Sequence, residues 1–427
     1  MISDSNKEAF VWIWLPDETQ PVVAGRLETD SGNTHFTYGK SYLERIADQP
    51  PAISIYEPEL PLQSGEIPSA AESSMPGCIR DASPDAWGRR VIINKVLGLD
   101  GADTDTAILD EMTYLLESGS DRTGALDFQR SPTQYVPRSA KNVDLEELIE
   151  AAERVEKGVQ LTPELEIALI HGTALGGARP KAQIQEEGIK YIAKFSSSTD
   201  LYSVVKAEFI AMRLALLAGL NVAPVKLVKS ANKDVLLVER FDRQLEEEGG
   251  WSRKAMVSAF TLLGLNEESG MMARYASYET LAEIIRHRFT DPINTLKELF
   301  SRLVFNILCG NTDDHARNHA AFWNGSELTL TPAYDICPQG RTGNEASQAM
   351  LISGSNSLSR LAICFEAANH FLLSEDDARA ISDHQINIIE QHWDQVCDEA
   401  ELSEVDRNLF WRRQFLNPFS IEGLTPH

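Results

Sequence analysis

The sequence has few cysteines, a deficit of basic charge and no long apolar run, and each of these absences excludes a class of protein. Its five cysteines form no Cys-x-x-Cys pair, which argues against a zinc ribbon or a disulfide scaffold and for reduced thiols in the cytoplasm. No run approaches the roughly 18 apolar residues of a membrane span. The first apolar stretch, Phe10 to Leu15, is too short for a signal peptide. We therefore expect a cytoplasmic protein that does not contact a membrane.

Acidic residues outnumber basic ones. Lysine and arginine total 39, aspartate and glutamate total 64, and the formal net charge is −25 over 427 residues. Because unaided binding to nucleic acid needs a basic surface, we expect DNA to be reached only through a basic partner. Hydrophobic residues make up 43% and charged residues 24%, which is typical of a globular protein, and roughly 100–200 residues per domain predicts two or three domains.

The first part of the chain is predicted to contain both strands and a helix. Period-two and turn signals predict strands near 10–15, 22–27 and 35–38, and a helix over 85–97. The apolar periodicity stops at residues 131–137, where we place a domain boundary, although one long surface loop would give the same signal.

The second part of the chain is predicted in the same way. It should hold a helix after Val143, a hairpin of strands 182–185 and 190–195, an amphipathic helix over 204–217 and strands at 225–229 and 235–239. Helical windows dominate after residue 250, and we expect Trp393 and Trp411 to pack in the last of them.

The polar run from Asn311 to His319 is the most informative part of the sequence. Asp313 and Asn318 are five residues apart, which is the spacing in the catalytic loop of protein kinases. Such a loop needs a carboxylate that orients or accepts the proton of a substrate hydroxyl, and a carboxamide oxygen that holds a metal ion. A second carboxylate should follow on a nearby turn, and Asp335 is placed for that role.

Two alternatives remain open for this run. A D-x-x-x-x-N match arises by chance in many proteins and is then a polar turn or a helix cap. A metal hydrolase is the other alternative, because His315 and His319 are spaced i, i+4. The zincin pattern requires Glu directly after the first His, however, and Ala316 stands there. His319 is therefore expected to be a structural side chain.

The kinase interpretation requires a strand lysine and a helical glutamate that holds it. Lys194 ends the predicted strand 190–195, and Glu208 lies beside the apolar stripe of the predicted helix 204–217. A lone carboxylate at a buried stripe is costly unless it is paired, so we expect Lys194 and Glu208 to form a pair. The alternative is a Glu208 at the exposed edge of the stripe.

Two further segments fit a nucleotide site. A glycine loop over residues 176–181 precedes the predicted hairpin, where glycines allow close approach to an anion and basic side chains add charge. Residues 238–243 follow a predicted strand, where a hinge between two lobes would offer backbone groups to a base. An ordinary glycine turn and a charged strand end are the alternatives.

In this order the segments resemble the HipA-like serine/threonine kinases, the toxin components of bacterial toxin–antitoxin pairs. The matching strings are Gly176 to Lys181 (GGARPK), Tyr191 to Phe195 (YIAKF), Val238 to Arg243 (VERFDR), Thr312 to Asn318 (TDDHARN) and Leu330 to Asp335 (LTPAYD). The strings Ile79 to Trp87 and Ser118 to Phe128 resemble the small first domain of the family. The resemblance therefore extends over nearly the whole chain.

The resemblance implies an α+β fold with two parts. A small mixed N-terminal domain would cover residues 1–137, and a two-lobed kinase-like domain would cover 138–427. Within the latter, the strand-rich nucleotide lobe would span about 145–245 and the mostly helical catalytic lobe about 246–427.

The resemblance also implies roles for individual residues. Asp313 would be the catalytic base, Asn318 and Asp335 would hold Mg²⁺, and Lys194, oriented by Glu208, would contact the ATP phosphates. The remaining ATP-binding residues would be Gly176, Gly177, Ala178, Arg179, Pro180, Lys181, Glu239, Arg240, Phe241, His315 and Tyr334. The family further implies a protein substrate, an aminoacyl-tRNA synthetase in known members, and a small helix-turn-helix antitoxin through which the kinase reaches DNA.

Two positions depart from the family pattern. Members often carry a serine two residues before the glycine pair, and phosphorylation of that serine shuts the enzyme down. Ala174 stands there in this chain, so Thr173 beside it is the candidate for autophosphorylation. Some members have glycine after the catalytic Asp, where this chain has Asp314. We expect this added carboxylate to lie near the metals and to shift metal affinity or proton transfer.

A binding protein is the second functional interpretation. The chain would then be a nucleotide-binding corepressor or scaffold that acts with the antitoxin at DNA without significant turnover. The complete set of catalytic residue types argues against it, whereas the acidic charge is compatible with both interpretations.

Overall fold

The computed structural model describes residues 7–30, 33–69, 74–97, 105–138, 144–157, 179–197, 200–266, 275–341 and 343–422, together with 159, 161–162, 165–166, 169 and 177. The chain divides into two compact units. Unit 1 holds residues 1–199, 228–257 and 322–326, and unit 2 holds residues 200–227, 258–321 and 327–427. The predicted domain boundary at residue 137 lies inside unit 1 and stays a prediction.

The first part of unit 1 is built on a five-stranded antiparallel sheet in the order β4-β3-β2-β1-β5. Its strands are β1 (Glu8–Ile13), β2 (Val22–Asp30), β3 (Asn33–Tyr38), β4 (Glu66–Pro68) and β5 (Leu126–Gln129). Burial alternates along β3, where Phe36 and Tyr38 face the interior, as the period of two of a strand requires. The strands predicted near 10–15, 22–27 and 35–38 are confirmed.

The helices of unit 1 are short. They are α1 (Lys40–Leu43), η1 (Glu44–Ala47), α2 (Gly77–Arg80), α3 (Ala86–Leu97), η2 (Thr106–Ile108), α4 (Glu111–Glu117) and α5 (Leu145–Glu156). Asp110 and Asp144 begin α4 and α5, and each carboxylate accepts a hydrogen bond from a backbone N–H of the first turn, the usual way to satisfy a free donor at a helix start. The helices predicted over 85–97 and after Val143 are confirmed as α3 and α5.

A second sheet has the strand order β6-β7-β9-β8 and lies in unit 1, except that residues 225–227 of β8 belong to unit 2. Its strands are β6 (Lys181–Glu186), β7 (Ile189–Phe195), β8 (Val225–Ser230) and β9 (Lys233–Glu239), and β10 (Arg243–Leu245) pairs separately with β11 (Trp251–Arg253). On β7, Tyr191, Ala193 and Phe195 are buried while Ile192 and Lys194 are partly exposed. This alternation and the two predicted strand pairs are confirmed.

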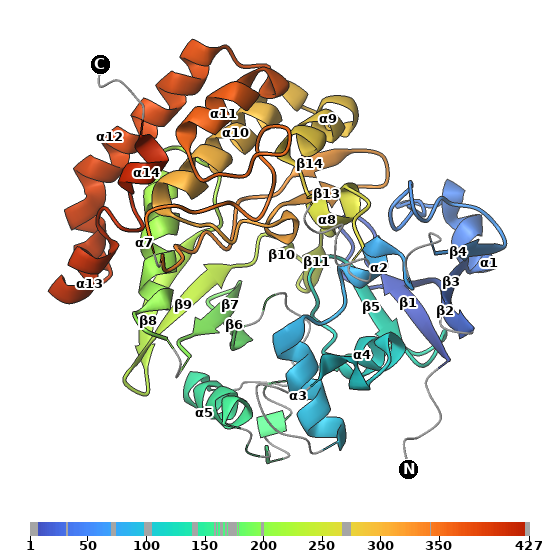
Figure 1. Cartoon of the computed structure of the whole chain (residues 1–427). Coiled ribbons are helices and arrows are strands. Elements are labelled where there is room, and N and C mark those ends of the chain that lie inside the picture. The colour runs from blue at the N-terminus through green and yellow to red at the C-terminus, as the bar shows by residue number, and fades with distance from the viewer. Residues whose placement is uncertain are drawn as a thin grey trace. The chain divides into compact units, whose positions relative to one another are not determined.

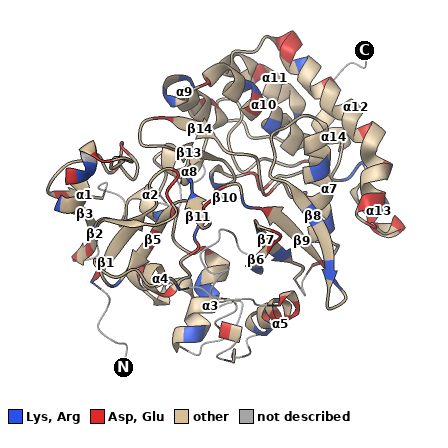
Figure 2. Cartoon of the chain, turned by 180° about the vertical axis from the view of Figure 1, so that it is seen from behind, with Lys and Arg blue, Asp and Glu red and all other residues tan. Residues whose placement is uncertain are grey.

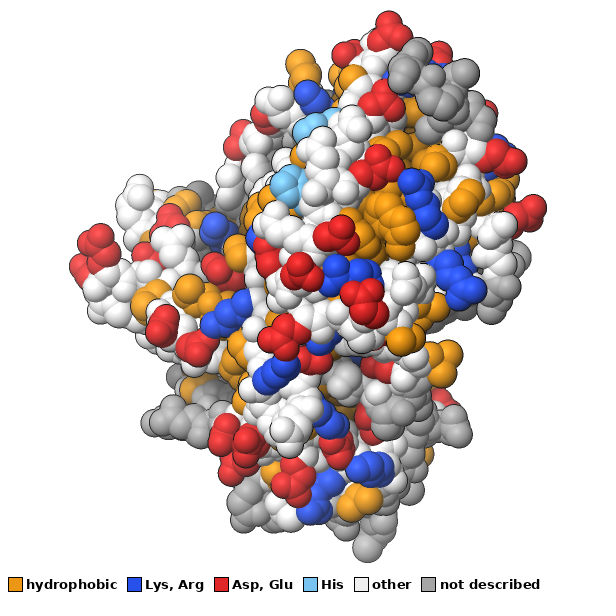
Figure 3. Space-filling view, turned by 90° about the vertical axis from the view of Figure 1, so that its left-hand side faces the viewer, with side chains coloured by type: hydrophobic (Ala, Val, Ile, Leu, Met, Phe, Trp, Pro, Cys, Tyr) orange, Lys and Arg blue, Asp and Glu red, His pale blue; other side chains and the backbone are white. Residues whose placement is uncertain are grey.

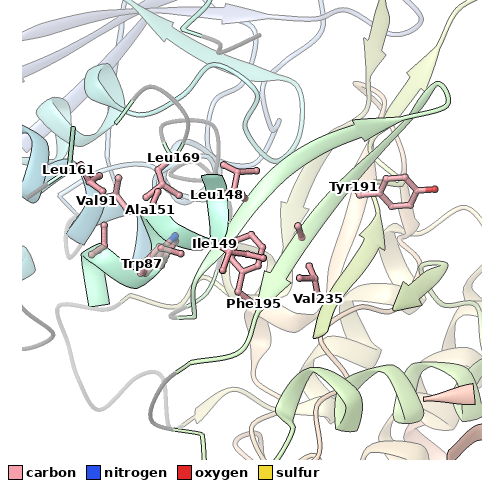
Figure 4. Packing of buried hydrophobic residues seen from close by; sticks show 14 of the residues in the cluster. Trp87, Val91, Leu148, Ile149, Ala151, Leu161, Leu169, Tyr191, Phe195 and Val235 are labelled. Carbon is pink, nitrogen blue, oxygen red and sulfur yellow. The ribbon is translucent and has the colours of Figure 1, made fainter. Parts of the chain in front are cut away.

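One apolar core joins α3 and α5 to this sheet (Figure 4). Trp87 and Val91 come from α3, Ile149 comes from α5, and Phe195 and Val235 come from β7 and β9. Apolar surface removed from water contributes roughly 25 cal/mol per Å², so this cluster fixes α3 and α5 on the sheet that carries Lys194.

Unit 2 is mainly helical. Its elements are α7 (Val204–Leu217), α8 (Ala259–Leu262), α9 (Tyr278–Arg288), α10 (Pro292–Cys309), η4 (Ala316–Asn318), β14 (Leu328–Leu330), α11 (Leu361–Ala367), η5 (Ala368–Phe371), α12 (Glu375–Glu399), α13 (Glu404–Phe410) and α14 (Pro418–Ile421). The strands β12 (Ala255–Ser258) and β13 (Ala320–Trp323) have residues in both units. The predicted α+β class is confirmed, with a sheet-containing N-terminal part and a mainly helical C-terminal region.

The central helix α10 has clear start and stop signals. Asp291 caps its first turn, Pro292 follows at the first helical position, and Gly310 ends it with φ 75°. A Cβ at Gly310 would lie 2.7 Å from the backbone oxygen of Gln414, so the close approach as well as the left-handed φ requires glycine. The chain therefore leaves α10 in a fixed direction at Asn311.

The helix α12 packs against α7, α10 and α11 (Figure 1). It begins with a capping box, in which the Ser374 hydroxyl accepts from the N–H of Asp377 and the Asp377 carboxylate accepts from the N–H of Ser374. Near its end, the rings of Trp393 and Trp411 lie 5.0 Å apart, which confirms the predicted packing of these two residues.

Surface charge follows the composition. The ribbon of α13 carries the colour of acidic residues in Figure 2, in keeping with Glu404 and Asp406 in its first turn. On the face shown in Figure 3, acidic and basic side chains are interspersed, and its described part carries no continuous basic area. All five cysteines are buried free thiols, as predicted. Within the described residues, no helix is both long enough and apolar enough to cross a membrane.

Candidate functional site

The loop after α10 brings Asp313 and Asn318 together. Asn318 ends the short helix η4, and its N–H donates to the backbone oxygen of His315 at 2.8 Å. Its side-chain Nδ2 donates to the backbone oxygen of Asp313 at 3.3 Å. Because the nitrogen and the oxygen of a carboxamide point in opposite directions, this bond turns Oδ1 of Asn318 away from that carbonyl. The side chain of Asp313 itself is exposed.

Asp335 lies on a second segment that hydrogen bonds place beside this loop. Asn311 Nδ2 lies 3.5 Å from the backbone oxygen of Asp335, and the N–H of Ala333 donates to the oxygen of Asn221 at 2.8 Å. Asp335 has φ 60°, in the left-handed region that costs a non-glycine residue energy and that is enriched at functional sites. The structure therefore holds Asp335 in a specific, unusual conformation.

The carboxylates of Asp313 and Asp335 are close enough to interact. Removal from water raises the pKa of Asp313, His315 lowers it, and the negative charges of Asp335 and Asp314 raise it further. Two carboxylates this close form a region of negative potential, which favours a cation. Asp313, Asn318 and Asp335, predicted from spacing alone, are thus brought together within unit 2.

The donors at this place suit Mg²⁺. The side chains of Asn318 and Asp335 offer hard oxygen atoms, the ligands that Mg²⁺ prefers, and the Asn318 carboxamide already has its nitrogen engaged elsewhere. Across the described part of the chain, no group of three or more His, Cys, Asp or Glu residues could hold a metal by itself. A pair of protein ligands fits Mg²⁺ nevertheless, because this ion commonly keeps several waters and takes the rest of its ligands from phosphates.

His315 and Tyr334, both predicted to line the nucleotide pocket, have different surroundings. His315 is exposed. The hydroxyl of Tyr334 donates to the backbone oxygen of Arg317 at 2.7 Å, and the Arg317 guanidinium lies 4.0 Å from the ring centroid of Phe260. Tyr334 therefore ties the segment of Asp335 to the loop of Asp313, and its role at a nucleotide stays a prediction.

Asp314 is buried, not placed among the predicted metal ligands. It is 2% exposed, and its Oδ1 lies 3.0 Å from Nε2 of His319 while its Oδ2 accepts a hydrogen bond from the hydroxyl of Tyr278. Two interior partners therefore hold that carboxylate, while its negative charge still raises the pKa of Asp313; the expectation that Asp314 shifts metal affinity or proton transfer stays a prediction. His319 is a structural side chain, as predicted. The hydrolase alternative is wrong, because His319 is buried and His315 is exposed.

The described part of the glycine loop is held by the segment around Trp87. Gly177 has φ 102°; its N–H donates to Oδ2 of Asp85, and its carbonyl accepts from the N–H of Trp87 at 3.4 Å. The indole N–H of Trp87 donates to the backbone oxygen of Lys181 at 3.3 Å. Both ends of the loop thus contact one N-terminal segment. Among the predicted site residues, Thr173, Gly176 and Ala178 lie outside the described residues, whereas Gly177, Arg179, Pro180 and Lys181 lie within them.

The segment 238–243 alternates between two faces. Arg240, Asp242 and Arg243 are buried, whereas Glu239 and Phe241 are partly exposed, and the ring of Phe241 lies 5.9 Å from that of Phe322. Glu239 and Phe241 therefore face away from the interior, where a base could approach them.

The Arg240 guanidinium lies in a buried ion network. It donates to the carboxylate of Asp242 at 2.8 Å, to that of Asp121 at 3.1 Å and to the backbone oxygen of Arg122 at 2.7 Å. Burial alone would lower the pKa of Arg240, but the charges of Asp242 and Asp121 outweigh it and raise that pKa. This side chain therefore connects segments of unit 1, and the predicted contact of Arg240 with ATP stays a prediction.

Lys194 and Glu208 belong to different units. Lys194 is partly exposed on β7, opposite Lys181 on β6 and Leu236 on β9. Glu208 is 4% exposed on α7, so it is buried and not the edge residue of the alternative. The predicted pair of Lys194 and Glu208 stays a prediction.

The sequence did not reveal three residues that support the site, Asp85, Asp121 and Tyr278. It also did not reveal that Asp314 is paired in the interior. Asp85 and Asp121 lie inside the strings that resemble the first domain of the family, which was the available signal. Tyr278 carried none, because it is 36 residues from Asp314 and lies at the start of an ordinary amphipathic helix.

Comparisons with known proteins identify the family of this chain. Residues 173–398 match the family model of the HipA-like C-terminal domain, and residues 13–129 match that of the HipA N-terminal domain. The chain is 26% identical over 186 residues to the serine/threonine-protein kinase toxin HipA of Shewanella oneidensis, and 29% identical over 150 residues to the putative kinase Y4mE of Sinorhizobium fredii. These alignments cover 38% and 34% of this chain and only 42% and 33% of the two relatives.

A solved structure shows the same fold over nearly the full length. It is the complex of Shewanella oneidensis HipA, HipB and operator DNA, whose matching chain superposes with a TM-score of 0.69 at 20% identity, covering 94% of this chain and 93% of that one. Because the C-terminal family model alone covers more than half of the 427 residues, the chain belongs to the HipA-like family.

Proposed function

We propose that this protein is an ATP- and Mg²⁺-dependent serine/threonine protein kinase of the HipA type, which restrains growth by phosphorylating a cellular protein. The observation that carries the proposal is the convergence of Asp313, Asn318 and Asp335. The Asn318 side chain donates to the backbone of Asp313, and the charge of Asp335 raises the pKa of Asp313. In the proposal they are a base and two oxygen ligands, the groups that the catalytic site of a protein kinase combines.

Each of the three residues has a defined role in the proposed reaction. Asp313 is exposed, so its carboxylate can reach a hydroxyl of the protein substrate, orient it and accept its proton. Asn318 and Asp335 hold Mg²⁺ through their side-chain oxygens. When it is bound, Mg²⁺ neutralises charge on the phosphates.

Unit 1 supplies the proposed nucleotide contacts. The glycine loop contacts the phosphates in this proposal, since Gly177 has a positive φ and no side chain that would keep an anion away from the backbone. Lys194 contributes a cation from β7. Glu239 and Phe241 meet the base, because the alternation of the segment turns them away from the buried network.

The proposed partners follow from the family. The solved complex names HipA, HipB and operator DNA together, and we propose that this chain likewise pairs with a small helix-turn-helix antitoxin. With a net charge of −25, it would reach DNA through that partner. The substrate is proposed to be a protein, with an aminoacyl-tRNA synthetase as the first one to test.

Transfer of labelled phosphate from ATP to proteins of a cell extract tests the proposed function. The wild-type chain should label at least one protein band, and Asp313→Ala should lower the rate by roughly 10²–10⁴-fold, the usual contribution of a positioned acid or base. A wild-type chain that binds ATP but labels nothing would instead favour the nucleotide-binding corepressor or scaffold.

A further inference from the structure

The two residues that directly follow Asp313 and Asn318 are paired with each other in the interior. Asp314 Oδ1 lies 3.0 Å from Nε2 of His319, and the exposed fraction of each residue is 2%. Tyr278, the first residue of α9, donates its hydroxyl to Oδ2 of Asp314, and the same hydroxyl lies 3.3 Å from Nε2 of His319. The rings of Tyr278 and His319 meet edge to face at 5.5 Å. We call Tyr278, Asp314 and His319 the loop clamp.

The clamp determines which way the neighbouring side chains point. Along residues 313–316 exposure alternates, since Asp313 and His315 are exposed while Asp314 and Ala316 are buried. Asp313 lies in the turn after α10, and the backbone is extended at His315, so the anchored side chain of Asp314 constrains the backbone on which Asp313 lies. Holding Asp314 in the interior therefore turns Asp313 outward, towards a substrate.

The clamp also closes the loop across its base. The pair of Asp314 and His319 joins residues five positions apart, as does the hydrogen bond from Asn318 Nδ2 to the oxygen of Asp313 one position earlier. The backbone oxygen of His319 in turn accepts a hydrogen bond from the N–H of Ala259 at 2.8 Å. The backbone oxygen of Thr312 accepts one from the N–H of Ala349 at 3.1 Å. The loop is thus tied at both ends to other elements of unit 2, and the clamp sets the separation of its ends.

We propose that Tyr278, Asp314 and His319 are positioning residues that hold the proposed base Asp313 and the proposed metal ligand Asn318 at a working separation; this inference rests on the proposed function. None of the three touches substrate, because all are buried and bonded to one another. Their contribution reaches the reaction only through the geometry of Asp313 and Asn318. Partners of this kind behind metal ligands typically change metal affinity or activity by about 10–100-fold.

The full-length chain carrying single substitutions tests the clamp. Tyr278→Phe removes one hydroxyl, His319→Leu removes the imidazole donor, and His319→Gln places an amide nitrogen near the position of Nε2. We expect His319→Leu to lower kcat by about 10–100-fold and to raise the Mg²⁺ concentration for half-maximal rate by a similar factor. His319→Gln should restore most of both quantities, because it can still donate to Asp314.

A matched variant separates positioning from general destabilisation. Tyr42→Phe removes another buried hydroxyl, which donates to the backbone oxygen of Ile53 at 2.7 Å in unit 1. Both Tyr→Phe variants should lower the thermal midpoint to a similar extent, but only Tyr278→Phe should change kcat and the Mg²⁺ dependence. If Tyr278→Phe and His319→Leu lower the midpoint and leave kcat and the Mg²⁺ dependence as in Tyr42→Phe, the clamp is only structural and the proposal is wrong.

Direct metal binding distinguishes failure of the clamp from failure of the proposed function. Mn²⁺ binding in the presence of ATP, followed by electron paramagnetic resonance, needs no turnover. If the wild-type chain transfers no phosphate, the proposed function fails, and the clamp is then judged by Mn²⁺ alone. Weakening of Mn²⁺ affinity by about tenfold or more in His319→Leu, with recovery in His319→Gln, supports the clamp; equal affinities in all variants overturn it.

Discussion

The carboxylate of Asp121 lies 3.1 Å from the guanidinium of Arg240, although 119 residues separate them. Asp121 also lies 2.8 Å from Nε of Arg243 and pairs with Lys190 of β7. Burial alone would raise the pKa of Asp121, but these cations outweigh it and hold that pKa well below its usual range. One partly buried carboxylate of the segment 118–128 therefore holds the strand end that carries Glu239 and Phe241.

A second N-terminal segment supports the glycine loop in the same way. Asp85 accepts a hydrogen bond from the N–H of Gly177, and Trp87 bonds to both Gly177 and Lys181. The two strings of the sequence that resemble the first domain of the family thus contact the two segments proposed to bind nucleotide. Both contacts lie within unit 1.

Removing the charge of Asp121 should destabilise the fold. Asp121→Asn removes the negative charge that faces Arg240, Arg243 and Lys190. Removing one partner of a buried ion pair costs about 3–5 kcal/mol of the free energy of unfolding. Urea unfolding measures this loss. Glu150→Gln, which breaks the exposed pair with Arg154 on α5, is the matched control and should change stability by no more than about 0.5 kcal/mol. Equal effects of the two variants would contradict a structural role for the buried network.

The same network predicts a loss of stability in acid. Burial raises the pKa of Asp242, but Arg240 and Arg243 outweigh it and lower that pKa to about 2, from 3.8. Because the folded state then binds fewer protons than the unfolded state, this stabilisation is complete above about pH 4 and is lost as the pH falls towards about 2. The free energy of unfolding measured from pH 6 to pH 2 should fall in that window. The free energy of unfolding of Asp242→Asn should fall less steeply in the same window. Identical slopes for this variant and the wild-type chain would contradict the prediction.

The predicted pair of Lys194 and Glu208 can be tested by a double-mutant cycle. If the two side chains pair when ATP is bound, the effects of Lys194→Ala and Glu208→Ala on ATP affinity should not add, and the coupling should be roughly 0.5–3 kcal/mol. Lys190→Ala combined with Glu208→Ala is a suitable control cycle, because Lys190 already pairs with Asp121. Additive effects in the Lys194 cycle would show that the two residues act independently.

Autophosphorylation is expected at Thr173. After incubation with ATP, mass spectrometry of the wild-type chain should find phosphate on the peptide that carries Thr173, and Thr173→Ala and Asp313→Ala should both lose it. Phosphate that persists in Thr173→Ala at another residue of 160–185 would place the switch elsewhere, and its absence from this whole region would remove the switch.

Local patterns predicted the elements well, because each depends on neighbours in the chain. The helix expected over 204–217 is α7 (Val204–Leu217), and the two faces expected for β7 are those observed. The spacing of Asp313 and Asn318 likewise identified a loop whose geometry depends on a few consecutive residues. Periodicity and spacing are sufficient wherever local backbone geometry decides the outcome.

Long-range partners could not be predicted in this way. Nothing near Arg240 in the sequence shows that its guanidinium donates to Asp121, which is 119 residues away. Nothing near Asp314 in the sequence shows that its carboxylate accepts a hydrogen bond from Tyr278, which is 36 residues away. A charged side chain is stable in the interior only beside a partner of opposite charge. The tertiary fold determines which residue that partner is.

The most direct test of the central claim separates the base from the metal ligands. Single-turnover phosphate transfer should be measured against Mg²⁺ concentration for the wild-type chain, Asp313→Asn and Asp335→Asn. Asparagine at 335 still tolerates the left-handed backbone, so its effect reports the lost charge. Asp313→Asn should lower the rate at saturating Mg²⁺ by roughly 10²-fold or more while leaving the Mg²⁺ dependence near that of the wild type, whereas Asp335→Asn should raise the Mg²⁺ requirement. If the wild-type rate does not depend on Mg²⁺, or if neither substitution changes it, Asp313, Asn318 and Asp335 do not form a phosphoryl-transfer site.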